Sequence, residues 1–180
     1  MGTPVQHSAS QTDEELTILI RQSDLAAFKI IYYRYYEKLS RFVWLKTNNP
    51  DFEDVVQEVF SRLWESRKKL VNIKSFQAYI YRITNNLIID YYRKKSHRFD
   101  HLTTTPEKPV QSNEENWDKH IDLESAIANL PDKVREVFIL SRFEGLKYTE
   151  IALICDVSVK TIESRLSKAV TILREKLGQA

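Results

Sequence analysis

The polar face of the last predicted helix carries side chains of the types that bind nucleic acids. When residues 158–177 are projected as an α-helix, apolar and polar side chains separate onto opposite arcs. The apolar arc, which we predict to pack inward, consists of Ile162, Leu166, Ala169, Val170, Leu173 and Leu177. The polar arc holds Lys160, Thr161, Ser164 and Lys168, with Arg165 at its edge. Cations and short hydroxyls donate to phosphates and base edges, so the pattern favours contact with duplex DNA over a face that only meets water.

The residues before this helix make the DNA-binding interpretation more specific. Residues 149–155 predict a short helix, residues 155–157 a tight break, and Ser158 a cap for the longer helix. A short helix, a turn and a second helix form the helix-turn-helix layout, in which the second helix enters the major groove.

The helix predicted over residues 51–70 has a polar side that is open to two interpretations. Its apolar stripe, predicted to be core, consists of Val55, Val56, Val59, Phe60, Leu63 and Trp64. The other faces carry Asp54, Gln57, Glu58, Ser61 and Arg62. These side chains either meet only water or form a docking surface whose acids match a basic helix of another protein.

The helix predicted over residues 75–98 combines tyrosines and amides with a basic end. Between residues 82 and 98 five cations accompany a single acid, whereas residues 113–124 carry five acids and one lysine. We interpret this as a basic helix end that meets phosphate, followed by an acidic segment that does not. Exposed aromatic rings beside cations would suit stacking on single-stranded bases. Tyrosines half-buried at a domain surface are the more common arrangement, and we favour it for these residues.

No arrangement of side chains in the sequence indicates a catalytic or metal centre. There is no Ser/His/Asp or Cys/His set, and no glycine loop that would cradle a phosphate. His97 and His101 have helical spacing, but no third ligand type lies nearby, so we do not expect a zinc site. We therefore predict a protein that is not an enzyme and that has no cofactor, metal or small-molecule substrate.

Cysteine usage and the first residues favour the cytoplasm. Cys155 is the only cysteine, which excludes an internal disulfide. The first ten residues lack the basic and apolar regions of a signal peptide. No apolar run approaches the ~20 residues that a membrane span requires. We therefore predict a cytoplasmic protein.

The elements that must position these side chains are helices. Only three glycines and five prolines occur among 180 residues, which argues against a many-stranded sheet. Helical spacing predicts an all-α fold of two small helical domains joined by a flexible linker. We expect a disordered N-terminus over residues 1–11, a first domain over 12–98, a linker over 99–116 and a second domain over 117–180. The predicted helices cover residues 13–22, 25–46, 51–70, 76–96, 118–129, 132–144, 149–155 and 158–177.

Three motifs occur in order along the chain. They are "DFEDVVQEVFSRLW", "AYIYRITNNLIIDYYRKK" and "LPDKVREVFILSRFEGLKYTEIALICDVSVKTIESRLSKAVTILREKL". Together they resemble the sigma-70 family of bacterial RNA polymerase sigma factors, and in particular its short extracytoplasmic-function (ECF) class, which keeps only conserved regions two and four. The resemblance covers residues 25–96 and 123–177 and leaves out the first helix, the linker and both termini.

The resemblance implies two sets of contacts for region two. The "DVVQEVF" helix would dock on the clamp helices of the polymerase beta-prime subunit through Asp54, Gln57, Glu58 and Arg62. The helix over 75–98 and the loop before it would capture the non-template strand at the minus-ten element, where a base is flipped and read in a pocket. The residues that match the family pattern there are Asn86, Asp90, Arg93 and Lys94.

For region four the resemblance implies a contact with the polymerase beta flap and recognition of the minus-thirty-five element as duplex DNA. The residues implied to contact this element are Lys160, Thr161, Ser164, Arg165 and Lys168. The two promoter elements lie about two helical turns apart, or roughly 70 Å. Two positions depart from the class, because Asn85 and Glu163 stand where it usually has a basic residue.

The function implied by the resemblance is that of an ECF sigma factor. Such a protein binds core RNA polymerase and directs promoter recognition, DNA opening and transcription initiation, and an anti-sigma factor, often membrane-anchored, holds it inactive. Two other functions remain open at this point. A stand-alone helix-turn-helix regulator of the response-regulator output type would bind duplex DNA tightly without polymerase. A helical adaptor would bind only proteins, and the cations of the last helix would then be inert.

Overall fold

The computed structural model describes residues 11–47, 52–71, 73–99 and 123–177, and the side chains of 94–99 and of residue 124 are outside this description. Within these ranges the chain is helical and contains no strand, so the predicted all-α fold is confirmed. The elements are α1 (Asp13–Arg21), α2 (Leu25–Thr47), α3 (Phe52–Glu65), the 3-10 helix η1 (Arg67–Lys69), α4 (Phe76–Phe99), α5 (Leu123–Ala128), α6 (Asp132–Arg142), α7 (Tyr148–Cys155) and α8 (Val159–Leu177).

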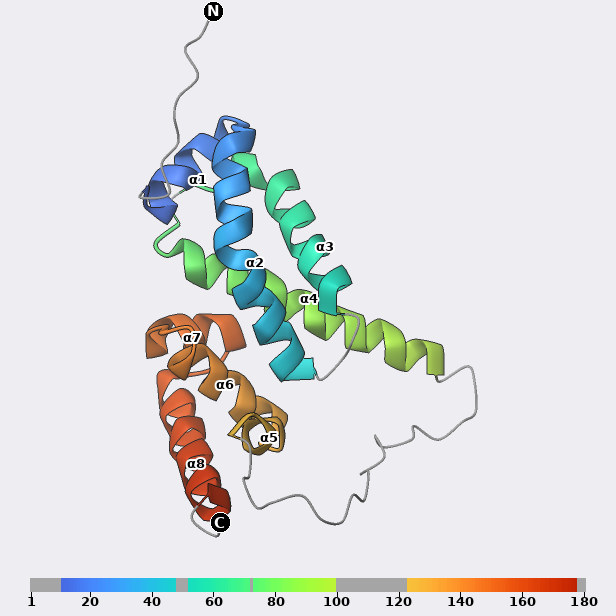
Figure 1. Ribbon diagram of the computed structural model, residues 1–180, viewed down its shortest axis with the longest axis vertical. Helices are drawn as coiled ribbons and strands as arrows, with labels where there is room; N and C mark the ends of the chain where they lie inside the picture. Colours follow the sequence, from blue (N-terminus) through green and yellow to red (C-terminus); the bar gives the residue numbers. More distant parts are fainter. Residues whose placement is uncertain (1–10, 48–51, 72, 100–122, 178–180) are drawn as a thin grey trace, which may run out of the picture.

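Helices α1 to α4 form the first helical group, in which α2 and α4 cross and α3 packs against both (Figure 1). The core consists of aliphatic and aromatic side chains spaced three or four residues apart, such as Ile31, Tyr35 and Leu39 on α2. Phe42 on α2 meets Tyr81 on α4 edge to face, with ring centroids 5.2 Å apart. Burial of these large side chains is what holds the group together.

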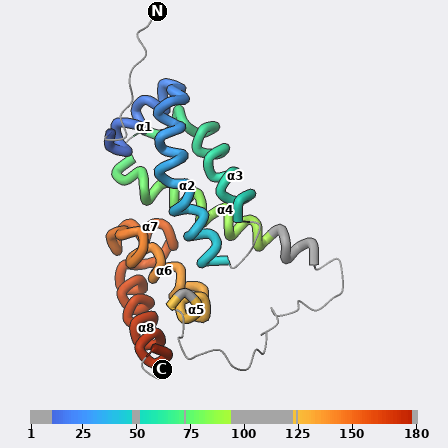
Figure 2. Tube along the Cα trace, viewed as in Figure 1, coloured from blue at the N-terminus to red at the C-terminus, as the bar shows by residue number. Residues whose placement is uncertain are grey.

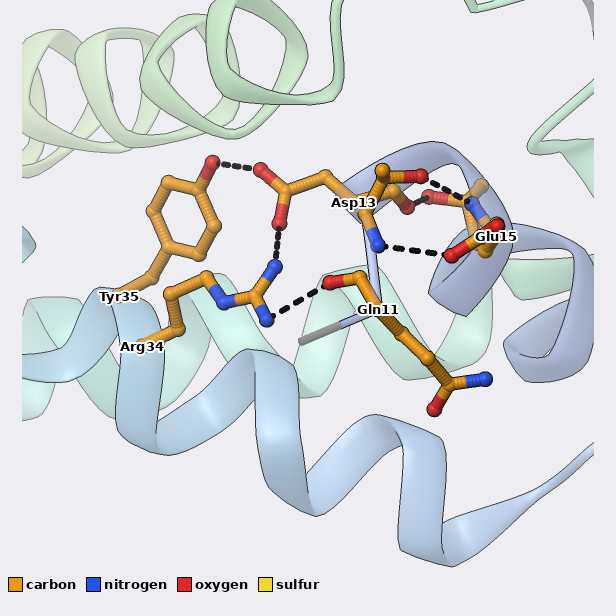
Figure 3. A network of polar contacts seen from close by, with 7 residues as sticks. Gln11, Asp13, Glu15, Arg34 and Tyr35 are labelled. Carbon is orange, nitrogen blue, oxygen red and sulfur yellow. Dashed lines mark hydrogen bonds and ion pairs between the residues drawn. The ribbon is translucent and has the colours of Figure 1, made fainter. Parts of the chain in front are cut away.

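A polar network fixes α1 on this group (Figure 3). The Asp13 carboxylate accepts a hydrogen bond from the Tyr35 hydroxyl and forms an ion pair of 2.5 Å with Nη1 of Arg34. Arg34 also donates through Nη2 to the carbonyl oxygen of Gln11, at 2.9 Å. The helix begins with a capping box, in which Thr12 and Glu15 each bond the other's backbone N–H. The first helix is therefore anchored both at its cap and by its side chains.

Helices α5 to α8 form the second helical group. Helix α8 packs along α6 and α7, and its buried face is built from Ile162, Leu166, Ala169 and Leu173. Gly145, which follows α6, has a φ of +66°, a conformation that side chains other than glycine rarely adopt. A glycine at this position lets the chain leave α6 and turn into α7.

The two groups pack directly against each other. Helix α7 lies beside the first half of α4, and α5 and α6 contact α2 (Figures 1 and 2). The sequence did not predict this contact, because helical spacing reports which face of a helix is apolar and not which distant helix covers it.

The structure corrects one helix boundary of the first group. Helix α3 ends at Glu65, not near Leu70, and a 3-10 turn follows it. The Arg67 guanidinium stacks on the Trp64 ring, 4.4 Å from the centroid, and donates to the Trp64 carbonyl at 2.8 Å. This tight turn brings Leu70 into the core, where only 2% of its surface is exposed. Residues 1–10 of the expected disordered N-terminus, most of the expected linker and residues 117–122 lie outside the described residues.

Candidate nucleic-acid interface

The turn between α7 and α8 is held by backbone and side-chain bonds. Asp156 adopts a left-handed conformation with a φ of 52°, which short polar residues tolerate better than others do. The Val157 N–H donates to the Ala152 carbonyl at 3.1 Å. Ser158 accepts from the Thr161 N–H at 3.2 Å and so caps α8, as predicted. The helix-turn-helix layout is therefore present, and its second helix starts from a fixed point.

The outer face of α8 gathers the cations and hydroxyls that were predicted to lie together. Lys160, Ser164 and Lys168 are exposed, and in the part of the chain that the structure describes they form no side-chain hydrogen bond or ion pair. Thr161 and Arg165 are half-buried at the edge of this face. The Thr161 hydroxyl lies 2.9 Å from that of Ser158, so it belongs partly to the cap. We call Lys160, Thr161, Ser164, Arg165 and Lys168 the α8 face.

The inward face of α8 differs from the projection at two positions. Val170 is half-buried and Leu177 is exposed, although both were expected to pack inward. Leu177 is the last residue of α8 and is 38% exposed. The other four residues of the predicted arc are buried.

The polar side of α3 is open to solvent. Asp54, Gln57 and Glu58 are exposed, and Arg62 is half-buried. Arg62 forms an i, i+4 ion pair with Glu58, with Nε and Oε1 at 2.9 Å. In Figure 1 α3 lies on the opposite side of the first group from α8. We call these four residues the α3 face.

The predicted residues of α4 lie next to the α3 face. Asn86 and Arg93 are exposed, Asp90 is half-buried, and Arg93 pairs with Asp90 at 3.1 Å. Lys94 is on the same helix, but its side chain lies outside the described residues. We call Asn86, Asp90, Arg93 and Lys94 the α4 face.

Two hollows join the α3 and α4 faces. A cavity of about 440 Å³ is lined by Arg62, Glu65, Ser66, Lys69, Tyr79, Ile83 and Asn86. A second cavity of about 320 Å³ is lined by Asp54, Val55, Glu58, Arg62, Leu87, Asp90 and Tyr91. Arg62 borders both cavities. The α3 face and the α4 face, which nothing in the sequence connected, therefore form one continuous surface.

The tyrosines of α4 do not form a row of exposed rings. Tyr81 is fully buried, and the Tyr79 hydroxyl lies 3.4 Å from that of Ser66. Tyr92 is 42% exposed, and its hydroxyl donates to the Thr47 carbonyl at 3.1 Å. Burial against the rest of the first group, as we favoured from the sequence, explains most of these side chains.

Asn85 points away from the α4 face and into the contact between the helical groups. Only 3% of its surface is exposed. Its amide nitrogen donates to the carbonyl oxygen of Ile154 at 3.1 Å, and its amide oxygen accepts from the Lys46 ammonium. Lys46 also forms an ion pair of 2.7 Å with Glu136. Neither Lys46 nor Glu136 stands out in the sequence, because no local pattern signals partners that are 90 residues apart.

Burial at this contact changes the titration of two groups. Burial raises the pKa of the Cys155 thiol to about 12, and the nearby Glu136 carboxylate adds to the shift. Burial also raises the pKa of the Glu144 carboxyl group, although Tyr81, Lys38 and Arg41 oppose the shift. Within the described ranges no group of three or more His, Cys, Asp or Glu side chains could hold a metal ion. A search of the same ranges finds no helix with the length and apolar character to cross a membrane.

Each of the two helical groups matches a known protein-family model. The family model for sigma-70 region 2 matches residues 31–98, and the family model for sigma-70 region 4 matches residues 120–173. The chain is 29% identical to an ECF RNA polymerase sigma-E factor of Haemophilus influenzae, over 92% of this chain and 95% of the relative. It is 27% identical to the ECF RNA polymerase sigma-E factor of Escherichia coli K12, over 94% and 96% respectively.

Two solved structures share the fold. The sigma factor RpoE of Bartonella quintana, in complex with the anti-sigma factor NepR, has a TM-score of 0.69 and 25% identity, covering 84% of this chain and 96% of that one. CnrH in complex with the cytosolic domain of CnrY also has a TM-score of 0.69, at 22% identity, and the match covers 96% of this chain and 99% of that one.

Proposed function

Since this chain belongs to the sigma-70 family, as a promoter-recognition sigma factor of the ECF class, we propose that it binds core RNA polymerase and opens promoters through the three faces defined above. The observation that carries the proposal is the α8 face, a set of cations and hydroxyls that lies on the second helix of a helix-turn-helix, in a chain that matches both sigma-70 regions.

The α8 face is proposed to read the minus-thirty-five element as duplex DNA. Lys160 and Lys168 would contact phosphates, which supply affinity and salt dependence. Ser164 and Arg165 would reach base edges in the major groove, which supply selection. The hydroxyl and the backbone N–H of Thr161 both bond Ser158, so Thr161 would act mainly by fixing the start of α8 against the DNA.

The α3 face is proposed to dock on the clamp helices of the polymerase beta-prime subunit. Its two acids and its glutamine are exposed, so they can meet a basic helix without moving the core. Contact of the second helical group with the polymerase beta flap would hold α8 at a distance from α4. The neighbouring α4 face would then receive the separated non-template strand at the minus-ten element.

The hollow beside Asn86 suits this role of the α4 face. It is bordered by an amide, by the Tyr79 ring and by the cations Arg62 and Lys69. These groups can stack on a flipped base, bond its edge and hold its phosphate. Unstacking costs a few kcal/mol per base, which such contacts offset.

Three further properties follow from the same proposal. The chain makes and breaks no covalent bond, since catalysis belongs to the polymerase. It acts where the polymerase acts, in the cytoplasm. Because RpoE of Bartonella quintana was solved with the anti-sigma factor NepR, we expect an anti-sigma factor to bind this chain as well.

Transcription with purified components tests the proposal. The chain is mixed with core polymerase and genomic fragments, and the starts of the run-off transcripts are mapped. We expect new starts that share two sequence elements about two helical turns apart. An Arg165→Ala, Lys168→Ala double variant should lose them. Unchanged transcription by this variant would favour a protein-binding adaptor, and tight duplex binding without polymerase would favour a stand-alone regulator.

A further inference from the structure

We infer that Glu163, an exposed carboxylate among the cations of α8, selects a cytosine in the duplex that this helix contacts. Its carboxylate would accept a hydrogen bond from the N4 amino group of cytosine in the major groove. This role deepens the function proposed above and rests on it. Because the ECF class usually has a basic residue at this position, the selection is expected to be particular to this chain.

Glu163 lies in the part of α8 that a helix-turn-helix brings to the base edges. Helix α8 begins at Val159, so Glu163 is its fifth residue. The residues near the start of the second helix are those that contact bases in this motif. Glu163 is exposed, and it shares one side of the helix with three other exposed residues at helical spacing, Lys160, Ser164 and Ser167. A duplex that reaches Ser164 therefore also reaches Glu163.

The backbone that carries Glu163 is held in place on both sides. Before it, Ser158 accepts a hydrogen bond from the backbone N–H of Thr161 at 3.2 Å and so fixes the first turn of α8. Its neighbours on the inward side of the helix, Ile162 and Leu166, are buried in the core. A side chain on a fixed helix can discriminate between bases, because base edges differ in where their donors and acceptors lie.

The Glu163 carboxylate is not engaged within the protein. In the ranges that the structure describes it forms no hydrogen bond and no ion pair. Lys160 lies one turn before it, a spacing at which opposite charges can pair on a helix, yet these two described side chains do not pair. On α3, by contrast, Glu58 and Arg62 do pair, at 2.9 Å. The carboxylate is therefore available to a ligand outside the protein.

A carboxylate that faces duplex DNA has few possible partners. An ionised carboxylate only accepts hydrogen bonds, so the phosphates cannot bond it and repel it. In the major groove guanine presents two acceptors, thymine an acceptor and a methyl group, and adenine a donor beside an acceptor. Cytosine alone presents a donor, its N4 amino group, without an acceptor of its own. The chemistry of Glu163 therefore favours cytosine over the other three bases.

An acid that only repels phosphate would behave differently from an acid that reads a base. Repulsion acts on the backbone, which is the same for all sequences, so it lowers affinity uniformly and changes no base preference. A bond to a base edge acts at one position of the element. Substitution of Glu163 separates these cases, because only the second predicts that a preference is lost at a single position.

Selection from random duplexes tests this role. The chain, assembled with core polymerase, is incubated with duplexes that contain a randomised segment, and the bound DNA is recovered, amplified and sequenced over several rounds. The variants are Glu163→Gln and Glu163→Ala. Glu175→Gln, which removes the same charge from another exposed position of α8, is the control. It lies about 18 Å further along the helix axis, away from the end that contacts bases.

We expect the unmodified chain to enrich a minus-thirty-five element in which one position holds cytosine about tenfold more often than any other base, as a good contact to a base edge provides. Glu163→Gln should shift this position toward adenine, because a glutamine amide can bond both N6 and N7 of adenine. Glu163→Ala should reduce the preference there to about twofold or less, since no contact remains. The other positions should be unchanged in all four proteins, and Glu175→Gln should match the unmodified chain throughout.

The results that would overturn this role are distinct from failure of the proposed function. If an element is enriched but its base preferences survive both substitutions of Glu163, this residue reads no base, and the proposed function stands. A preference lost at a position that holds a base other than cytosine would overturn the assignment of cytosine. If the unmodified chain enriches no common element, the proposed function fails and the role of Glu163 fails with it.

Discussion

The Lys46 ammonium lies 2.7 Å from Oε1 of Glu136, and this ion pair joins the end of α2 to the middle of α6. The two residues are 90 positions apart, one in the match to sigma-70 region 2 and the other in the match to region 4. The pair therefore makes the relative position of the two regions a property of this chain. It also means that the α3 face, proposed to bind polymerase, and the α8 face, proposed to bind DNA, need not bind their partners at the same time.

Substitution on the α8 face should weaken promoter binding in a salt-dependent way. Lys168→Ala removes one proposed phosphate contact, so the slope of log affinity against log salt should fall by about one. The measurement is fluorescence anisotropy of labelled promoter DNA with the assembled polymerase complex over a salt series. Lys133→Ala, an exposed cation on α6, is the control. An unchanged slope for Lys168→Ala would exclude this lysine from the phosphate contacts.

Charge reversal on the α3 face should weaken polymerase binding while leaving the chain folded. Glu58 is exposed and pairs with Arg62, so Glu58→Arg, which replaces this ion pair by two cations, is expected to lower the free energy of unfolding by about 1 kcal/mol or less. The same change places a cation opposite a basic partner and should weaken polymerase binding about tenfold or more. Affinity is measured by titrating labelled chain with core polymerase.

The matched control for this reversal is Glu14→Arg on α1. Glu14 is equally exposed, but it lies outside the α3 face. If both reversals weaken binding to the same extent, the effect reflects net charge and not the α3 face.

Loss of the Asp13 carboxylate should release α1 from α2. Asp13→Ala removes the bonds to Arg34 and Tyr35, both partly buried. We expect a loss of about 2 kcal/mol in the free energy of unfolding, since bonds to charged groups contribute ~1.5–3 kcal/mol each and part of this is recovered by hydration. Urea denaturation measures the change. Glu14→Ala, beside it on α1, should be nearly neutral, and an equally small effect of Asp13→Ala would show that α1 is held only by its apolar side chains.

The contact between the two helical groups should depend on pH through Glu144. Burial raises the pKa of this carboxyl group when the groups are packed together, and the groups that face it are Tyr81, Lys38 and Arg41. The packed chain therefore binds a proton in a pH range where a chain with separated groups does not, so the contact is favoured as the pH falls into that range and is weakened as the pH rises through the raised pKa. The radius of gyration of the free chain should then increase with pH. Glu144→Gln removes the titratable carboxyl group. If the radius of gyration of this variant still increases with pH, another group causes the increase.

Local chemistry made much of the fold predictable from the sequence. Ser158 forms the predicted cap, and Thr12, Asp24 and Ser75, residues of the types that cap helices, accept bonds from backbone N–H groups in the same way. These signals are reliable because each involves residues two or three positions apart. The α8 face was predictable for the same reason, since helical spacing alone brings its members to one side.

The remaining features depend on contacts between distant segments. The tyrosines of α4 were expected to be half-buried, yet Tyr81 is fully buried, and Asn85 is buried as well, because other helices cover that side. No sequence pattern in α2 or in α6 alone indicates that Lys46 pairs with Glu136. The early end of α3 depends on the stacking of Arg67 on Trp64, which spacing does not encode. Burial by a partner helix is a tertiary effect, and periodicity cannot identify the partner.

Direct binding to core polymerase tests the central claim most simply. Purified chain and purified core polymerase are mixed at low salt with no other protein present and are separated by size. The account predicts that the chain elutes with polymerase, that Glu58→Arg largely abolishes this co-elution, and that Lys168→Ala leaves it intact. A chain that elutes alone under these conditions would contradict the account.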